Sequence, residues 1–237
     1  MKETKLNVTL ISHTKNPEET VTAAIRQCYA KISAAKIIEK ITPEKTEQLI
    51  KQIISAGHTS TIEHASFTFA IEGISRACSH ELVRHRIASY SQQSQRYVSP
   101  EEGFDFIVPF KIKANKKLYK KFLEQMKESN KIYKEMANNN IPLEDARFVL
   151  PNACETKIVV TMNARSLLNF FQRRLCMRAQ WEIRQLALAM KKEVMKVAPN
   201  IFKHAGPTCD TEGICWEGRL ACEKAQKIKS IKIKERK

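Results

Sequence analysis

The sequence predicts a helix-rich mixed α/β fold in a single domain, and it argues against a Rossmann fold. A chain of 237 residues is long enough to bury the core of one domain. The predicted elements run strand, helix, helix, strand, helix, helix, strand, helix, which lacks the regular βαβ alternation of doubly wound folds. Neither GxGxxG nor GxxxxGKS/T occurs. A nucleotide or flavin must therefore be held by side chains and helix ends.

The N-terminal quarter predicts one strand and two helices. Apolar residues alternate from Lys5 to Ile11, as in a strand with one buried face. Asn16-Pro17 and Thr42-Pro43 each start a helix, because proline is favoured at the first helical position. Gly57 ends the second helix, and we expect residues 58–64 to form a loop.

The next segment predicts a strand that leads into a basic helix end. Phe67, Phe69 and Ile71 alternate as in a strand. Apolar residues then recur every four positions from Ile74 to Leu82, which predicts a helix. The polar stretch from Tyr90 to Ser99 is expected to be a loop.

The second half predicts mostly helix. Residues Asn115 to Met136 form a lysine-rich amphipathic pattern that three asparagines end. A short β-branched strand is predicted from Ile158 to Met162. The apolar stripes at 167–175 and 183–194 indicate either one helix or two with a break near Met177.

The chain is strongly basic, with 41 lysines and arginines against 25 acids and a net charge of +16. Such charge is typical of proteins that bind nucleic acid, a membrane surface or small anions. The last eleven residues hold six basic residues and one acid. We therefore divide the chain into a domain at 1–226 and a basic tail at 227–237. This tail is either mobile or, because its isoleucines alternate with lysines, a short edge strand.

Neither a signal segment nor a membrane span is evident, so the sequence predicts a cytoplasmic protein without a membrane partner. The seven cysteines are an odd number and indicate no disulfide framework. We expect Cys28, Cys78, Cys154 and Cys176 to be buried free thiols, because they lie in regular apolar segments.

The most informative stretch is RHRIASYSQQSQRY, residues 84–97. Guanidinium groups present a planar fork of donors that fits phosphate or paired carbonyls, while serine and glutamine supply directional contacts to a heterocycle. The alternative is a solvated basic face followed by a polar loop. The density of neutral donors favours an anionic ligand.

Two more blocks carry polar side chains. The first, GHTSTIEHASF at 57–67, places Ser60 close to His58, Glu63 and His64. A metal site is a weaker interpretation, because the histidine spacing does not match that of helical zinc sites. The second begins with EDARFVLP at 144–151 and continues through TMNARSLLNFFQRRL at 161–175 to AQWEIR at 179–184. There a helix cap at Asn163 and surface arginines are the alternative.

In their order along the chain, GHxSxxEH, RHRx7SQR and the later block resemble the flavin-dependent thymidylate synthase (ThyX) family over roughly half the chain. The resemblance implies the ThyX-like fold and reductive methylation of dUMP to dTMP. It also implies FAD as cofactor, methylenetetrahydrofolate as carbon donor, NADPH as reductant and assembly as a homotetramer with sites at subunit contacts. Nucleic acid is not an expected partner.

The resemblance also implies roles for individual residues. The expected dUMP contacts are Glu81, Arg84, Gln92, Gln93, Ser94, Gln95, Arg96, Arg147 and Arg174. The expected FAD contacts are Ser60, Arg84, His85, Arg86, Gln92, Asn163, Arg165 and Asn169. Arg174 has the catalytic role, because a fixed guanidinium beside the uracil carbonyl favours electron density at C5. Ser94 is expected to orient the nucleotide, so no enzyme nucleophile is needed.

Two other classes of function stay open. The charge and the lysine-rich helix suggest a nucleic-acid-binding protein, although aromatic residues make up only 7% of the chain. A zinc-stabilised scaffold would use His204, Cys209, Cys215 and Cys222. Their spacings are irregular and no CxxC occurs, so we expect no metal and interpret this segment as a turn-rich region that packs Trp216.

Overall fold

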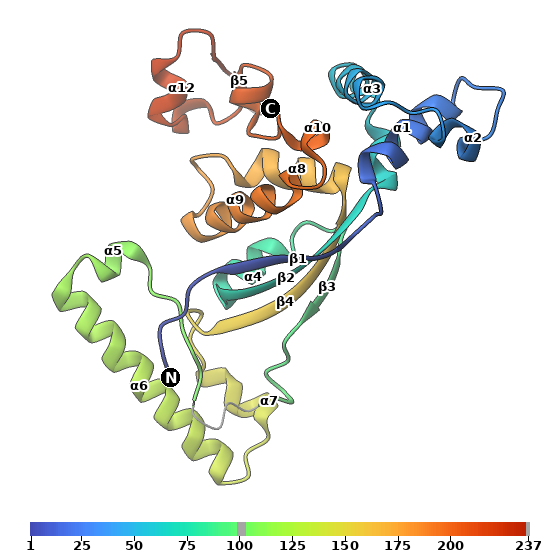
Figure 1. Ribbon diagram of the computed structural model, residues 1–237. Coiled ribbons are helices and arrows are strands. Elements are labelled where there is room, and N and C mark those ends of the chain that lie inside the picture. Colours follow the sequence, from blue (N-terminus) through green and yellow to red (C-terminus); the bar gives the residue numbers. More distant parts are fainter. Residues whose placement is uncertain (99–102, 236–237) are drawn as a thin grey trace. The chain divides into compact units, whose positions relative to one another are not determined.

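The computed structural model describes residues 1–98 and 103–235 (Figure 1). Within it the chain divides into two compact units. Unit 1 comprises Met1–Asn7, Ala70–Arg84 and Tyr90–Val159. Unit 2 comprises Val8–Phe69, His85–Ser89 and the chain from Val160 onward.

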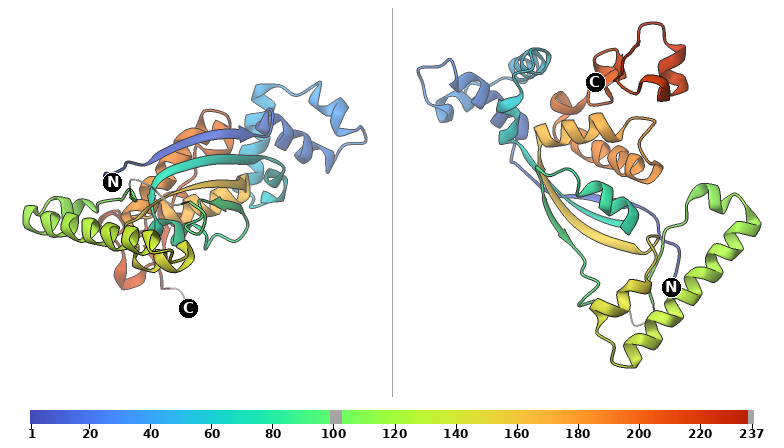
Figure 2. Two further views of the ribbon diagram at one scale, coloured as in Figure 1. Left: turned by 90° about the horizontal axis from the view of Figure 1, so that it is seen from below. Right: turned by 180° about the vertical axis from the view of Figure 1, so that it is seen from behind.

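A four-stranded sheet has the order β1-β2-β4-β3. Its strands are β1 (Asn7–His13), β2 (Ser66–Ser75), β4 (Glu155–Asn163) and β3 (Ser89–Gln92) (Figure 2). The remaining regular structure is mainly helical, so the mixed, helix-rich α/β class predicted from the sequence is confirmed. The strand order β1-β2-β4-β3 differs from the 3-2-1-4-5-6 order of a Rossmann fold.

Strand β2 is longer than the sequence predicts, and the expected helix from Ile74 begins later. Ile74 is buried within β2, and α4 spans only Arg76–Leu82. Ser75 caps this helix, because its Oγ accepts from the Cys78 N–H at 3.0 Å. Gly73, at φ +69°, lies so close to the Lys5 carbonyl that any β-carbon would collide with it.

The other helices of unit 1 follow β3 in the sequence and pack around a small hydrophobic core within this unit. They are α5 (Phe110–Lys113), α6 (Lys116–Asn138), α7 (Leu143–Ala146) and the 3-10 turn η2 (Arg147–Val149). Helix α6 begins where predicted, with Asn115 as its N-cap. The core combines Phe104, Phe106 and Met126 with the buried Cys154.

Unit 2 contains most of the remaining helices. They are α1 (Pro17–Gln27), α2 (Ala34–Ile38), α3 (Pro43–Ser55), η1 (Thr59–His64), α8 (Ala164–Arg174), α9 (Trp181–Met195) and α10 (Pro199–Phe202). The two apolar stripes therefore form two helices, with the break where the sequence allows it. Residues 59–64, expected as a loop, form a 3-10 turn. Phe202 packs edge-on against Phe67 and Phe171 in the core of this unit.

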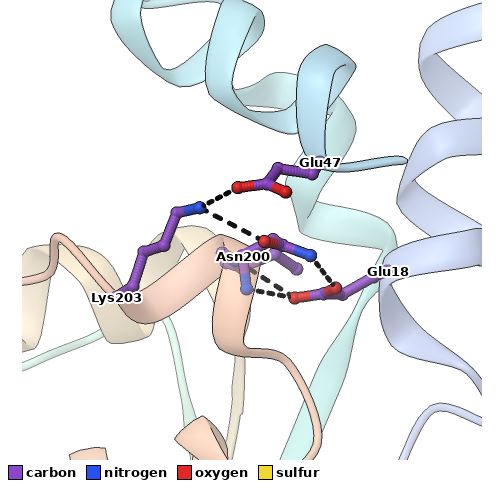
Figure 3. Close-up of polar contacts among 5 residues, drawn as sticks. Glu18, Glu47, Asn200 and Lys203 are labelled. Carbon is purple, nitrogen blue, oxygen red and sulfur yellow. Dashed lines mark hydrogen bonds and ion pairs between the residues drawn. The ribbon is translucent and has the colours of Figure 1, made fainter. Parts of the chain in front are cut away.

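A polar cluster ties α10 to α1 and α3 (Figure 3). The Glu18 carboxylate accepts from the backbone N–H and side-chain amide of Asn200, at 2.5 and 2.7 Å. Lys203 donates to Glu47 at 2.7 Å and to the Asn200 side chain at 3.3 Å. The hydrogen bond and charge of Lys203 lower the pKa of Glu47. These contacts join helices that are far apart in the sequence.

The C-terminal segment contains only short elements. They are α11 (Thr208–Thr211), β5 (Ile214–Cys215), η3 (Gly218–Leu220), α12 (Glu223–Lys227) and β6 (Lys232–Ile233). Strand β6 pairs in parallel with β5, so the alternative of a short strand within the basic tail is the one observed. Trp216 is half-buried beside the Lys234 ammonium. The last two residues of the tail lie outside the described residues.

Two further expectations were wrong. The stretch from Tyr90 was expected to be a loop, but residues 89–92 form β3, because pairing within the sheet outweighs a composition without aliphatic residues. Ser99, the last residue of that expected loop, lies outside the described residues. Cys28 is exposed rather than buried, because it follows the last turn of α1, and Cys176 is only half-buried, because it lies in the turn after α8. Within residues 1–98 and 103–235, no helix is both long and apolar enough to cross a membrane.

Candidate active site

Gln92 lies at the centre of a hydrogen-bonded group in unit 1. Its side-chain amide donates to Ser79 Oγ at 2.9 Å and to Thr156 Oγ1 at 3.1 Å. Arg76 also reaches Thr156 Oγ1, at 3.4 Å. Burial lowers the pKa of Arg76, and the charge of Arg147 lowers it further. We call Gln92, Ser79, Thr156 and Arg76 the Gln92 network. It presents neutral dipoles and one partly desolvated cation.

Two of the arginines expected to contact dUMP contact Glu144 of unit 1. Arg96 contacts Glu144 through Nε at 2.8 Å and through a terminal nitrogen at 2.7 Å. Arg147 Nε donates to the Glu144 backbone carbonyl at 3.1 Å. Arg96 also stacks over Tyr97, 5.4 Å from its ring centre. Glu144 therefore brings two guanidinium groups together.

Gln93, Ser94 and Gln95 line a cavity of about 170 Å³ in unit 1, together with Tyr133 and Cys154. Ser94 Oγ accepts from the Arg96 N–H at 3.1 Å, so this hydroxyl helps to shape its own turn. Burial raises the pKa of Cys154 to about 11. This thiol therefore stays protonated at neutral pH.

Arg174 contacts His85 in unit 2, although the two residues are 89 positions apart in the sequence. Arg174 Nε donates to His85 Nε2 at 3.0 Å. Burial lowers the pKa of His85 to about 4, and the charges of Arg174 and Arg173 act in the same direction. The ring of Phe170 packs edge-on against the imidazole at 5.0 Å. At neutral pH His85 is therefore uncharged and accepts a hydrogen bond from the Arg174 guanidinium. We call this contact between Arg174 and His85 the Arg174 pair.

A cavity of about 750 Å³ opens beside Arg174 within unit 2. Arg173, Arg178 and Gln172 line it from the chain around the end of α8, and Trp216 lines it from the C-terminal segment. This volume lies in the range of pockets that hold drug-sized ligands. Arg173, Arg174 and Arg178 line it together with Glu212 and Glu217, so its wall carries charges of both signs with one cation in excess.

A third polar group connects η1 with the start of α8. Arg165 pairs with Glu63 at 2.5 Å, and the Ala164 N–H donates to the Ala65 carbonyl at 2.8 Å. Asn163 Oδ1 accepts from the Ser166 N–H at 2.8 Å, so the helix-cap interpretation of Asn163 is confirmed. Ser60 and Asn169 are exposed on the same two elements.

The chain matches the family model described as "Thymidylate synthase complementing protein" over residues 9–200. A flavin-dependent thymidylate synthase of Geobacter sulfurreducens is 51% identical over 227 residues, which are 95% of this chain and 97% of that protein. The chain belongs to the flavin-dependent thymidylate synthase family. Proteins of the same name from Clostridium tetani and Pyrococcus furiosus are each 46% identical and cover 95% and 98% of this chain, and 96% and 99% of their own lengths. This assigns the chain to a family of enzymes.

A solved structure shows the same fold. The UMP/dUMP methylase PolB from Streptomyces cacaoi, crystallised with 5-Br dUMP, aligns with a TM-score of 0.75 and 22% sequence identity. The alignment covers 85% of this chain and 95% of PolB. The likeness extends the fold assignment beyond close relatives.

The donor set of unit 2 fits a flavin of the kind the family name implies. A flavin nucleotide carries a phosphorylated chain and a heterocycle with carbonyl and imino groups. Arg165 stands in the first turn of α8, where helix N–H groups and a cation favour phosphate. Ser60 and Asn169 are exposed and supply neutral donors and acceptors nearby. Both halves of a flavin nucleotide therefore find suitable groups on η1 and α8.

The remaining predicted residues lie around the end of α4. Glu81 is half-buried in the last turn of that helix, and Arg84 and Arg86 are exposed just beyond it. Tyr90 donates to the Leu82 carbonyl at 3.0 Å, and burial raises the pKa of this phenol to about 12. The contact fixes where the basic segment leaves the helix.

The sequence did not single out several members of these groups. They are Arg76, Ser79, Glu144 and Thr156. Thr156 carried a signal, because it occupies a buried position of the alternating β4 pattern where an apolar residue is expected. Glu144 and Ser79 carried none, since ordinary helix composition explains both.

Proposed function

We propose that this protein catalyses the reductive methylation of dUMP to dTMP. FAD would be its cofactor, methylenetetrahydrofolate its carbon donor and NADPH its reductant. The observation that carries the proposal is 46–51% identity to proteins named flavin-dependent thymidylate synthase along at least 95% of this chain. When bound, the flavin supplies the reducing equivalents of the reaction. The side chains of this protein would bind and orient the substrates and polarise the uracil ring.

Unit 1 supplies groups suited to a uracil nucleotide. Arg96 already pairs with the Glu144 carboxylate and Arg147 with the Glu144 backbone carbonyl, and a phosphate would offer both guanidinium groups an anionic partner. Gln92 is held by Ser79 and Thr156, so its amide orientation is fixed before a ligand arrives. We propose that these groups, with Glu81, Arg84, Gln93, Ser94 and Gln95, recognise dUMP.

Arg174 is the proposed catalytic residue. Forming a bond from uracil C5 to the incoming carbon shifts negative charge toward the ring carbonyls, and a fixed guanidinium stabilises that charge. His85 occupies the Arg174 Nε through an uncharged acceptor. Neutral imidazole positions the guanidinium without adding a charge at that nitrogen.

Unit 2 supplies the proposed flavin contacts. These are Ser60, His85, Arg86, Asn163, Arg165 and Asn169, with Arg84 and Gln92 proposed from unit 1. Asn163 uses its side-chain oxygen to cap α8, which leaves its amide N–H groups as the donors for this role. Glu63 holds Arg165 near Ser60 on η1.

We propose that no enzyme nucleophile takes part. A catalytic thiol must reach its thiolate form. Cys154 lines the unit 1 cavity, but its pKa of about 11 keeps it protonated. Cys78 is fully buried in α4. The hydroxyl of Ser94 accepts from its own turn, which supports an orienting role.

Assembly as a homotetramer is also proposed. Phe148 and Tyr97 of unit 1 are 84% and 77% exposed, and a subunit contact would cover such apolar surface. Light scattering of the purified protein tests this proposal directly. A monomer at micromolar concentration would contradict it.

The first experiment is a visible absorption spectrum of the purified protein, repeated on the supernatant after denaturation. Released FAD and dUMP-dependent formation of dTMP with methylenetetrahydrofolate and NADPH are expected. A protein that stays colourless after incubation with FAD, and forms no dTMP, would overturn the proposed function. Replacing FAD by FMN in the reconstitution identifies the flavin.

A further inference from the structure

A small cavity in unit 2 is lined by four cysteines. Its volume is about 100 Å³, and its walls include Cys176, Cys209, Cys215 and Cys222, which are four of the seven cysteines of the chain. All four are free thiols. They come from separate places: the turn after α8, helix α11, strand β5 and the N-cap of α12. The fold therefore gathers thiols that the sequence scatters.

The C-terminal segment has very little else to hold it together. Its buried cluster consists of Cys215, Ala221, Ala225 and Ile231, with Cys209 and Cys222 packed against it. Its strands are two residues long, and its helices span four or five. Small regions with so little apolar core usually rely on a disulfide or a structural metal. The thiols of this cluster therefore take core positions that leucine or phenylalanine side chains fill in larger domains.

The local contacts suit thiols that act as ligands. The Arg178 N–H donates to Cys176 Sγ at 3.5 Å, and hydrogen bonds to ligand atoms are the usual second layer of metal sites. An ion pair between Lys224 and Asp210 joins α12 to α11, the two helices nearest Cys222 and Cys209. The Cys209 thiol donates to the same Asp210 Oδ1 at 3.8 Å, a hydrogen bond that it gives up when it ionises to bind a metal.

We propose that Cys176, Cys209, Cys215 and Cys222 bind a single structural zinc ion. Four thiolates in tetrahedral array are a standard zinc coordination, and a cavity of about 100 Å³ has room for one ion. In residues 1–98 and 103–235, no three His, Cys, Asp or Glu side chains are already placed to hold a metal. The thiols must therefore rotate about their Cα–Cβ bonds onto the ion as it binds.

The proposed ligand set differs from the one the sequence suggested. His204 is exposed and does not line the cavity, whereas Cys176 does, 33 or more positions before the other three cysteines. The cysteines of the C-terminal segment show no regular spacing, because only three of the four proposed ligands lie there and the fourth is Cys176. Three irregular cysteines and a distant fourth give no local zinc motif.

The site also borders the proposed catalytic region. Cys176, Cys209 and Cys215 line the larger cavity as well, beside Arg173 and Arg174. Zinc would fix that wall by tying β5 and α11 to the end of α8. This consequence for turnover rests on the proposed function, but the zinc site itself does not.

Metal analysis of the full-length protein tests the proposal. The protein is purified under reducing conditions, treated with a weak chelator and desalted, and we expect about one zinc per chain. The zinc content of Cys222→Ser after the same treatment should be roughly ten-fold lower than that of the wild type. Cys28→Ser, an exposed cysteine in another part of the chain, is the matched control and should keep it. Zinc-free wild-type protein, or equal zinc in both variants, would overturn the proposal.

Cobalt substitution keeps the test decisive if Cys222→Ser does not fold. Wild-type protein unfolded with chelator and refolded with Co²⁺ should show a thiolate-to-cobalt charge-transfer band and intense tetrahedral ligand-field bands. Bound iron with inorganic sulfide, or an intact-protein mass that shows a disulfide among these four residues, would also overturn it. Flavin content and dTMP formation are measured on the same samples. Zinc-free protein that binds FAD and forms dTMP removes this inference and leaves the proposed function intact.

Discussion

The Gln92 network of unit 1 and the Arg174 pair of unit 2 orient polar groups by different means. Gln92 is fixed by two hydroxyls that change neither charge nor protonation near neutral pH. Arg174 is fixed by a histidine that accepts only while it is uncharged. The first arrangement is insensitive to pH, and the second depends on a burial-shifted imidazole. Under the proposed function, the pH-insensitive arrangement would bind the nucleotide and the pH-dependent one would polarise it.

Removing the guanidinium should have the largest effect on this comparison. We expect Arg174→Ala to lower the rate of dTMP formation by about 10²–10³-fold, because one preorganised donor at a developing charge is lost. FAD content should stay close to wild type. Turnover and flavin absorbance are measured together, with the exposed Arg26→Ala as control. Normal turnover in Arg174→Ala would end the assignment of this residue as catalytic.

The Gln92 network should respond through stability and substrate affinity. Thr156→Val removes the hydroxyl that accepts from Gln92 and Arg76, and these half-buried donors lose that partner. We expect a loss of about 1–3 kcal/mol in the free energy of unfolding and a raised KM for dUMP.

Denaturant melts and initial rates give both values. Thr161→Val lies on the same strand, where it breaks only a hydroxyl pair with Thr68 at 3.0 Å. A KM change of the same size in this control would mean that the network has no specific part in binding.

The Arg174 pair should show its dependence on pH. The pKa of His85 is about 4 in the folded protein against 6.5 for an unperturbed histidine. Between pH 4 and pH 6.5, His85 binds a proton more readily in the unfolded chain than in the folded protein. The contribution of uncharged His85 to stability is therefore complete above about pH 6.5 and is lost as the pH falls toward 4. Melting temperatures of wild type and His85→Gln, compared from pH 4 to pH 8, should diverge in slope within that window. Parallel curves would contradict the shifted pKa.

The Glu63–Arg165 pair should have the smallest effect. Its side chains are 42% and 55% exposed, and exposed ion pairs contribute about 0–1 kcal/mol. Glu63→Gln should therefore change the free energy of unfolding by less than about 0.5 kcal/mol in denaturant melts. Retention of FAD is the more sensitive measurement, because Glu63 holds Arg165. A large loss of stability would show that the pair is more than a surface contact.

Periodicity predicted the long elements well. Helix α6, the two helices that follow β4, and the alternating cores of β2 and β4 were all visible in the sequence, because each buries one regular face. The short polar strand β3 was not visible. Its residues form a strand only because β4 offers a neighbouring edge. For the candidate site, the sequence predicted the residues that carry family motifs and did not single out the residues that contact them, such as Thr156 and Glu144.

The sequence by itself determined which chemistry this chain carries: a cluster of permanent cations, neutral amides and hydroxyls, and a family signature that needs no structure to read. Only the tertiary structure decided which of those groups meet. His85 reaches Arg174 across 89 residues, and Cys176 joins three cysteines of the C-terminal segment around one cavity. Local sequence patterns reflect how well each residue fits a helix or a strand. They carry no record of distances between elements, because those distances are set by how the elements pack.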